Sequence, residues 1–263
     1  MLLAVMQAHA HVLDVEANLS TIDSAARKAV HAGADVLLTP ELFVVGYAPR
    51  RLGRDLDPAS LPDLHGRMRQ IAAQHGIALV YSLPAVDPSG WRITSTFVDD
   101  RGAEVASYVK VHLFGPEEKA VFTPGTEAPT VFEYHGLRLG MAICFDVEFP
   151  ETVRAAAGRG VELLLVPTAL GHGYESVSTQ LVPTRSMEGQ LFIAYANHAA
   201  SRDDAALAGT SVITDPWGDT LTVAGEGEQL LLADIDPAAV SRARQEINYG
   251  TERREDLYRR WGV

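Results

Sequence analysis

The chain has 263 residues, and its 47% hydrophobic share is enough to build a substantial core. Its 34 acidic and 22 basic residues give a formal net charge of −12, which disfavours nucleic acid and anionic membranes as partners. A single cysteine excludes an intramolecular disulfide framework, and no CxxC, HExxH, GxxxxGK[ST] or GxGxxG motif occurs. We therefore expect no metal and no nucleotide cofactor.

The N-terminal segment MLLAVMQAHAHV has no basic residue before its apolar run, so it is typical of a first strand and not of a signal peptide. The longest apolar stretch, Leu163 to Leu170, is shorter than the roughly 20 residues that a membrane span needs, and Pro167 interrupts it. These features predict a cytoplasmic protein without a membrane segment.

The first part of the chain alternates strand-like and helical runs, which predicts an α/β domain. The expected elements are a strand LLAVMQ, a helix from Asn18 to His31, a strand DVLLTP, a helix from Leu64 to His75 and a strand IALVYSLP. A strand-rich middle part follows, with the segments ITSTFVDD, EVASYVKVHLF, TVFEYHG and LRLGMAIC.

A second α/β stretch follows the middle part. It comprises a helix from Glu151 to Ala157, a strand ELLLVP, a helix from Ser178 to Glu188, a strand LFIAYAN and final strands up to Asp236. No Ser/Gly-rich or Pro-rich linker interrupts the chain, so we expect residues 1–263 to form one domain. From about residue 238 we expect a tail, and its arginines at 253, 254, 259 and 260 are typical of a solvated or subunit-contacting segment.

One internal echo links the two α/β stretches. The segments GADVLLTPE and GVELLLVPT, which begin at Gly33 and Gly160, share a glycine, an acid, a buried strand and a proline. Glycine ends a helix and proline ends a strand at matching points, so the two halves are predicted to be pseudo-symmetric. Glu41 and Thr168 would then leave equivalent strand ends. Two face-to-face sheets with helices outside satisfy the pattern, and so does one doubly wound sheet.

Three residues are candidates for chemistry, each with an ordinary alternative. Glu41 follows a buried strand, where burial could raise its pKa towards that of a working base, or it is a solvated loop residue. Strand alternation places Tyr108, Lys110 and His112 on one face, where Lys110 needs a carboxylate partner or protects a sheet edge. We expect His112 to pack or hydrogen-bond locally.

Cys144 ends the strand LRLGMAIC and precedes the polar segment FDVEFPE. A free cysteine is usually a small buried hydrophobe. The polar segment with Pro150 is instead typical of a turn into a helix, which would place the thiol at a strand-to-helix elbow, where backbone N–H groups can receive an oxyanion. No GxSxG motif offers a serine nucleophile. We expect the acids Asp146, Glu148 and Glu151 to anchor the elbow and not to do chemistry.

Together, the segments PELFVVGY, SYVKVHLFG, EEKAVFTPG and ICFDVEFPE resemble the nitrilase superfamily of carbon-nitrogen hydrolases. Each motif alone is weak, but their order and spacing are specific, and the resemblance runs from the first strand to about Asp236. It implies a four-layer αββα sandwich that assembles into homodimers or larger homo-oligomers. It also implies chemistry without a metal or organic cofactor.

The resemblance also implies a role for each matching residue. Cys144 corresponds to the nucleophile, Glu41 to the general base and Lys110 to the cation beside them. Glu118, directly before a lysine, corresponds to the second glutamate of the family and is preferred to Glu117. The backbone N–H of Phe145 would share the oxyanion with Lys110. The family commonly has Tyr or Trp where this chain has Phe145.

The resemblance further implies hydrolysis of a small-molecule amide through a thioester, as in the short amidases. Nitrile hydrolysis and N-carbamoyl amine hydrolysis remain alternatives, as does a catalytically silent binding protein of the same fold. Thr168 and Ala169 are expected to border the acyl pocket, and the loop from Leu170 to Tyr174 to cover it. Tyr47 and Phe114 are candidates for an apolar lining or for plain core packing.

Overall fold

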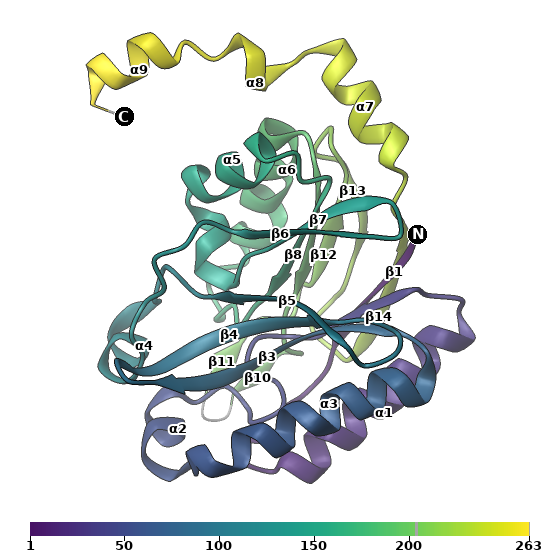
Figure 1. Cartoon of the computed structure of the whole chain (residues 1–263), viewed down its shortest axis with the longest axis vertical. Helices are drawn as coiled ribbons and strands as arrows, with labels where there is room; N and C mark the ends of the chain where they lie inside the picture. Colours follow the sequence, from purple (N-terminus) through teal and green to yellow (C-terminus); the bar gives the residue numbers. More distant parts are fainter. Residues whose placement is uncertain (203–204, 263) are drawn as a thin grey trace.

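Two six-stranded sheets pack face to face, and helices cover both outer faces (Figure 1). The structure is a computed structural model, and it describes residues 1–202 and 205–262. A separate two-stranded ribbon is formed by β10 (Ser201–Arg202) and β11 (Ala206–Leu207). The predicted αββα sandwich is confirmed, and the alternative of one doubly wound sheet is wrong.

The first sheet contains the strands expected from the first part of the chain, closed by the last strand. In spatial order they are β14 (Gln229–Asp234), β1 (Leu2–Gln7), β2 (Val36–Leu38), β3 (Ala78–Asp87), β4 (Gly90–Val98) and β5 (Glu104–Val109). Strands β1, β2 and β3 are parallel, and the outer strands pair antiparallel. The carboxyl ends of the parallel strands therefore meet at one edge.

The second sheet repeats this plan. In spatial order its strands are β13 (Thr220–Val223), β12 (Val212–Thr214), β9 (Phe192–Ala196), β8 (Leu163–Pro167), β7 (Leu137–Met141) and β6 (Thr130–Tyr134). Strands β7, β8 and β9 are parallel, with antiparallel strands outside them. Strand β2 thus corresponds to β8, and the predicted pseudo-symmetry of the two halves is confirmed.

The outer helices begin and end at residues with clear local causes. Helix α1 (Val15–His31) begins after Asp14, whose side chain accepts from the Ala17 N–H. Helix α3 (Leu61–His75) ends at Gly76, which has the left-handed φ of 64° that glycine adopts without strain. These two helices cover the first sheet, and α5 (Pro150–Gly158) and α6 (Val182–Gly189) cover the second (Figure 1).

The shorter helices lie in the connections. They are α2 (Pro49–Asp55), the 3₁₀ turn η1 (Pro58–Ser60), α4 (Gly115–Val121), the 3₁₀ turn η2 (Cys144–Glu148) and the π-helical turn η3 (Val177–Leu181). The helix expected from Ser178 to Glu188 therefore begins as η3 and continues as α6. The helix expected from Leu64 begins earlier, at Leu61, and the one expected from Asn18 begins at Val15.

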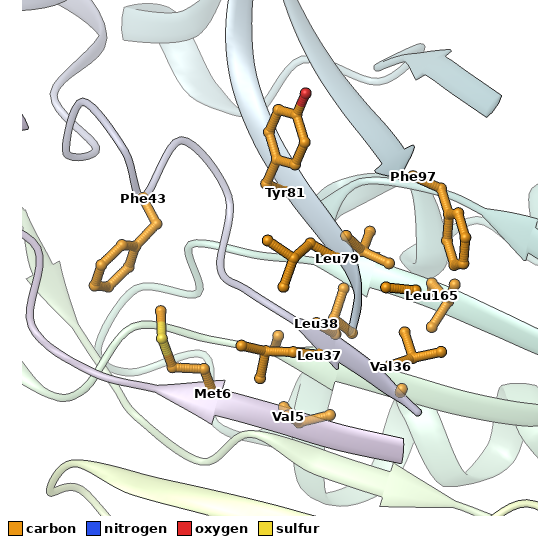
Figure 2. Close-up of a cluster of buried hydrophobic side chains, with 14 of the residues drawn as sticks. Val5, Met6, Val36, Leu37, Leu38, Phe43, Leu79, Tyr81, Phe97 and Leu165 are labelled. Atoms are coloured by element: carbon orange, nitrogen blue, oxygen red, sulfur yellow. The ribbon is translucent and has the colours of Figure 1, made fainter. Parts of the chain in front are cut away.

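The core has two layers because the central strands are buried on both faces. In β8, Leu163 and Leu165 pack between the sheets, whereas Leu164 and Val166 pack under the outer helices. Figure 2 shows Leu165 of the second sheet among side chains of the first. Burial of apolar surface stabilises the folded chain by roughly 25 cal/mol per Å². The apolar contacts between the two sheets therefore hold them together.

The segment 237–262, called the C-terminal arm below, extends across the outer side of α5 and α6 (Figure 1). It comprises α7 (Pro237–Glu246), α8 (Tyr249–Glu252) and α9 (Glu255–Trp261). Gln190 ties it to the body by donating to the Ala243 carbonyl at 2.9 Å. Within residues 1–202 and 205–262, no helix is both long and apolar enough to cross a membrane.

Candidate active site

Cys144 lies at a sharp turn between the end of β7 and helix α5. Its φ of 48° is in the left-handed region, which costs a non-glycine residue about 1–2 kcal/mol. Strained single residues of this kind are found where a surrounding structure holds a reactive group in place. Pro150 occupies the start of α5, as predicted, and the 3₁₀ turn η2 begins at Cys144 itself. The side chain is buried, with 5% exposure.

Glu41 lies three residues beyond β2 and is fully buried. Its backbone N–H donates to the Thr168 carbonyl at 3.2 Å, so the equivalent strand ends of the two sheets are joined directly. His198 Nε2 donates to the Glu41 carbonyl at 2.7 Å, which fixes the backbone from the other side. Burial lowers the pKa of His198 to about 4, so its ring is neutral at pH 7. Because Glu41 is fully buried, the alternative that it is a solvated loop residue is wrong.

Lys110 lies one residue beyond β5 and is also fully buried. Its Nζ donates to Glu41 Oε1 at 2.7 Å and to the two carboxylate oxygens of Glu118 at 2.8 and 2.9 Å. An ammonium group between two buried carboxylates is not a sheet-edge protective lysine. The expected carboxylate partner of Lys110 is thus present twice.

The choice of Glu118 over Glu117 agrees with the geometry. Glu118 is fully buried, and its Oε2 also accepts from the Phe114 N–H at 2.8 Å. Glu117 points outward, where its side chain is 60% exposed and pairs with Arg50 at 3.3 Å. The two neighbours on α4 therefore differ completely in environment.

Tyr47 has a contact that the sequence did not reveal. Its hydroxyl donates to Glu118 Oε1 at 2.6 Å, so it holds the second glutamate in addition to contributing ring surface. Burial and the nearby carboxylates raise the pKa of Tyr47 well above its usual value, which keeps it a donor. The signal in the sequence was the short separation of six residues between Tyr47 and Glu41. A residue that close in the chain can reach the same cluster as Glu41, and therefore Glu118.

The charges of the cluster are strongly coupled. Burial raises the pKa of Glu41 to about 7, although the Lys110 ammonium opposes the rise. Burial raises the pKa of the Cys144 thiol as well, and the negative charge of Glu41 adds to the rise. For Lys110, burial acts to lower the pKa, but the negative groups around it prevail and raise it. At neutral pH the thiol is protonated, Lys110 is charged and Glu41 is close to its midpoint.

One oxygen of Glu41 is available for the thiol proton. Oε1 is occupied by Lys110, whereas Oε2 is buried and has no hydrogen-bond partner among the described residues. Cys144 is near enough to Glu41 to influence its pKa. A buried carboxylate oxygen without a partner is costly, and such oxygens are found where a substrate or a reacting group completes the site.

Aromatic rings pack against Phe145, the residue that follows Cys144. Phe114 packs edge-to-face against Phe145, with ring centroids 5.3 Å apart, and against Tyr174 at 5.7 Å. Tyr174 belongs to the loop that was expected to cover the pocket, and it is 52% exposed. Thr168 and Ala169 are buried at the end of β8. The loop from Leu170 onward therefore reaches the residue next to the nucleophile through an aromatic chain.

Sequence reasoning missed two residues after β9. Asn197 Oδ1 accepts from the Leu170 N–H at 2.9 Å, and its Nδ2 donates to the Gly209 carbonyl at 2.6 Å, which fixes the loop after β8. His198 supports Glu41 as described above. The signal lay in the strand LFIAYAN and the histidine after it, because β9 is parallel to β8 and ends at the same edge.

The chain matches a known protein family. A model of the carbon-nitrogen hydrolase family matches residues 2–245, which extends past Asp236 into the C-terminal arm. The chain belongs to the carbon-nitrogen hydrolase family. Among its relatives in this family are an (R)-stereoselective amidase of Pseudomonas sp., 32% identical over 84% of this chain and 80% of the relative, and the 2-oxoglutaramate amidase of Bacillus subtilis, 29% identical over 86% and 87%.

Solved structures of a nitrilase-superfamily amidase resemble this carbon-nitrogen hydrolase over nearly its whole length. The amidase of Nesterenkonia sp. AN1 is 42% identical, covers 99% of both chains and superimposes with a TM-score of 0.92. One variant of that amidase carries the acetamide moiety of fluoroacetamide covalently at its active-site cysteine. Another variant is in complex with butyramide.

Proposed function

We propose that this carbon-nitrogen hydrolase hydrolyses small amides to a carboxylic acid and ammonia through a thioester on Cys144. The observation that carries the proposal is the buried cluster of Glu41, Lys110 and Glu118 beside the only thiol in the chain. The amidase relatives, and the covalent adduct on the cysteine of the Nesterenkonia amidase, support the same chemistry.

In the first step Cys144 attacks the amide carbon. Burial keeps the thiol protonated, so a base must take its proton during the attack, and Glu41 Oε2 is the acceptor. Because the pKa of Glu41 is about 7, its carboxylate can accept this proton and then return it to the leaving nitrogen. The C–N bond breaks, ammonia leaves, and the acyl group remains on sulfur.

The developing oxyanion is stabilised by two donors. The Lys110 ammonium is held at the site by both glutamates, and the N–H of Phe145 follows the nucleophile at the elbow. Losing one such donor typically costs about 3–4 kcal/mol of transition-state stabilisation. Glu118 and Tyr47 keep Lys110 in place, since a buried lysine with one carboxylate fewer would move or lose its charge.

In the second step water hydrolyses the thioester. Glu41 again accepts a proton, this time from water, and the hydroxide adds to the acyl carbon. The acid leaves, and the proton returns to sulfur to regenerate Cys144. Every proton and bond is thus accounted for by the amide, one water molecule and the residues of this site.

The substrate is proposed to have a small acyl group. Cys144 is only 5% exposed, and Phe145 beside it in the chain packs edge-to-face against Phe114. Nitrile hydrolysis and N-carbamoyl amine hydrolysis would use the same nucleophile and base. The amide proposal is favoured because a cysteine-to-alanine variant of the amidase that is 42% identical to this chain forms a complex with butyramide.

The test is ammonia release from matched substrates. We expect acetamide, propionamide and butyramide to release ammonia faster than the nitriles with the same acyl chains and faster than N-carbamoyl amines. We also expect a mass increase of one acyl group on the peptide that contains Cys144 after rapid acid quenching. Faster release from the nitriles would overturn the amidase assignment. A protein that neither releases ammonia nor acylates would be the silent binding protein instead.

We further propose that the chain is one domain whose C-terminal arm contacts a second copy in a cytoplasmic homodimer. The arm leaves Ile247, Tyr249 and Trp261 exposed, and Tyr249 and Trp261 line a groove of about 710 Å³ against α5 and α6. The test is light scattering of the purified chain, with the expectation of twice the monomer mass. A Trp261→Ser variant should shift the equilibrium towards monomer, and a monomeric wild-type chain would overturn this proposal.

A further inference from the structure

We propose that Asp146 is a positioning residue that fixes the catalytic lysine relative to the nucleophile. The proposal rests on the amide hydrolysis proposed above and adds a residue to it. Asp146 is fully buried, and its hydrogen-bond partners lie outside the elbow as well as within it. Its carboxylate accepts four hydrogen bonds from two distant parts of the chain.

Three of the four donor groups belong to the two residues that flank the catalytic lysine. Tyr108 and His112 lie two residues before and two residues after Lys110. The Tyr108 hydroxyl donates to Asp146 Oδ2 at 3.0 Å. The backbone N–H of His112 and its ring Nδ1 both contact Asp146 Oδ1 at 2.8 Å. The segment that presents Lys110 is therefore held at both ends by one carboxylate.

The fourth donor lies in the nucleophile elbow. The Ile143 N–H donates to Asp146 Oδ2 at 3.1 Å, and the Asp146 N–H donates to the Ile143 carbonyl at 3.0 Å. These reciprocal bonds bridge the residues that enclose Cys144 and Phe145. They span the left-handed backbone at Cys144 and help to offset its cost.

The spacing gives Asp146 its function. It stands two residues after Cys144 and binds the residues two before and two after Lys110, so the nucleophile and the cation share one anchor. The His112 ring also stacks on Phe149 at 3.9 Å between centroids, which ties the same segment to the start of α5. Asp146 does not act on the substrate; it sets where Lys110 and the Phe145 N–H stand relative to the sulfur.

A positioning role predicts a specific pattern of loss. Amide hydrolysis passes through an oxyanion that needs both donors, whereas alkylation of the thiol by iodoacetamide forms no oxyanion. A small displacement of the donors should therefore lower amide turnover strongly and alkylation only slightly. Misplacement by about 1 Å costs on the order of 10²-fold in rate. Substrate binding should change little, so the loss should appear in kcat.

The experiment removes donors to Asp146 while it keeps side-chain shape. Tyr108→Phe deletes only the hydroxyl, and His112→Phe keeps a ring that can stack on Phe149. The matched control is Tyr81→Phe, because Tyr81 is a buried tyrosine of the same sheet whose hydroxyl contacts His65 at 3.0 Å, away from the site. Each variant is assayed for amide turnover, for the rate of iodoacetamide alkylation of Cys144 and for Tm.

We expect the Tyr108→Phe/His112→Phe double variant to lose about 10²-fold in kcat, with KM and the alkylation rate within about threefold of wild type. Tyr81→Phe should lower Tm by a similar amount to Tyr108→Phe and leave kcat unchanged. Asp146→Asn should resemble the double variant. Its amide N–H₂ would face the Ile143 N–H, and because both groups are donors this hydrogen bond would be lost.

Wild-type kcat in the double variant would overturn the positioning role. So would a parallel loss of turnover, alkylation and Tm, which would show that Asp146 only supports the fold. These outcomes differ from failure of the proposed function, in which the wild-type chain itself would release no ammonia from amides while its thiol could still be alkylated.

Discussion

The two halves of the molecule share one topology but differ in the residues at equivalent strand ends. The offset that aligns Leu3 with Leu139 in the strand pairing also aligns Ala8 with Cys144. The offset of the sequence echo aligns Glu41 with Thr168. The second half therefore has the proposed nucleophile where the first has alanine, and the first half has the proposed base where the second has threonine.

This difference shows that neither half contains a complete site. The shared topology brings the carboxyl ends of β2 and β8 together, as the bond from the Glu41 N–H to the Thr168 carbonyl shows. The chemistry then depends on which residue occupies each of the equivalent places. Substitutions at these places should therefore remove different parts of the chemistry.

The largest effect is expected for Cys144→Ala, which places in the second half the alanine that the first half has at the equivalent position, Ala8. Amide turnover should fall by at least about 10⁴-fold, because no other group can form the acyl intermediate. Ammonia release measures the loss, and circular dichroism with Tm checks the fold. Retention of more than a few per cent of the activity would remove Cys144 from the mechanism.

Glu41→Gln should lower kcat/KM by about 10²–10⁴-fold, because the amide cannot accept the thiol proton. In the wild-type chain Glu41 has a pKa of about 7, so the active carboxylate is present above that pH and is lost by protonation below it. We therefore expect kcat/KM to fall about tenfold per pH unit below pH 7. The raised pKa of Lys110 should prevent an alkaline loss from that group.

A pH series of kcat/KM from 5 to 9 checks this prediction directly. The residual activity of Glu41→Gln should lack the acidic fall. A flat wild-type profile between pH 5 and 8 would contradict the assignment of Glu41 as the base.

Glu118→Gln should have an intermediate effect, with kcat lowered by roughly 10 to 100-fold, because Lys110 loses one of its two charged partners. Its neighbour supplies a matched control: Glu117 is exposed, so Glu117→Gln should change kcat by less than about twofold. Steady-state kinetics on one amide compares the two variants. Equal effects at both positions would show that burial beside Lys110 has no catalytic importance.

The smallest effect is expected at the aromatic chain. Tyr174→Ala removes the outer ring that packs on Phe114, and we expect kcat/KM for longer acyl chains to rise by about three- to tenfold relative to acetamide. His172→Ala, on the same loop, is the control and should leave the chain-length profile unchanged. An unaltered profile in Tyr174→Ala would exclude this loop from acyl selection.

Much of the fold could be predicted from sequence because its signals are local. Glycine and proline mark the ends of both copies of the echo, and the buried strands are continuous apolar runs. The order of Glu41, Lys110 and Cys144 identified the cluster through family resemblance. The alternation expected for Tyr108, Lys110 and His112 extends past the strand, since β5 ends at Val109, yet Tyr108 and His112 both contact Asp146.

The remaining features depend on contacts between distant residues. Whether Glu41 is solvated or buried is decided by His198 and Thr168, which are far away in sequence. Tyr47 was expected to line or pack, and its bond to Glu118 arises because the helix that follows it, α2, packs against α4. The three helices of the C-terminal arm lacked an apolar periodic face strong enough to predict, since much of their surface is exposed.

Because Cys144 is the only sulfhydryl in the chain, a thiol reagent labels one position. The number of labels per chain therefore measures the fraction of chains whose Cys144 is still a free thiol, without a substrate. The same feature determines the response to oxidants: a sulfenic acid at Cys144 has no second cysteine in its chain with which to form a disulfide. Burial raises the pKa of Cys144 and keeps the sulfur mostly protonated. Because peroxide reacts with the thiolate, the low thiolate content should slow oxidation of Cys144.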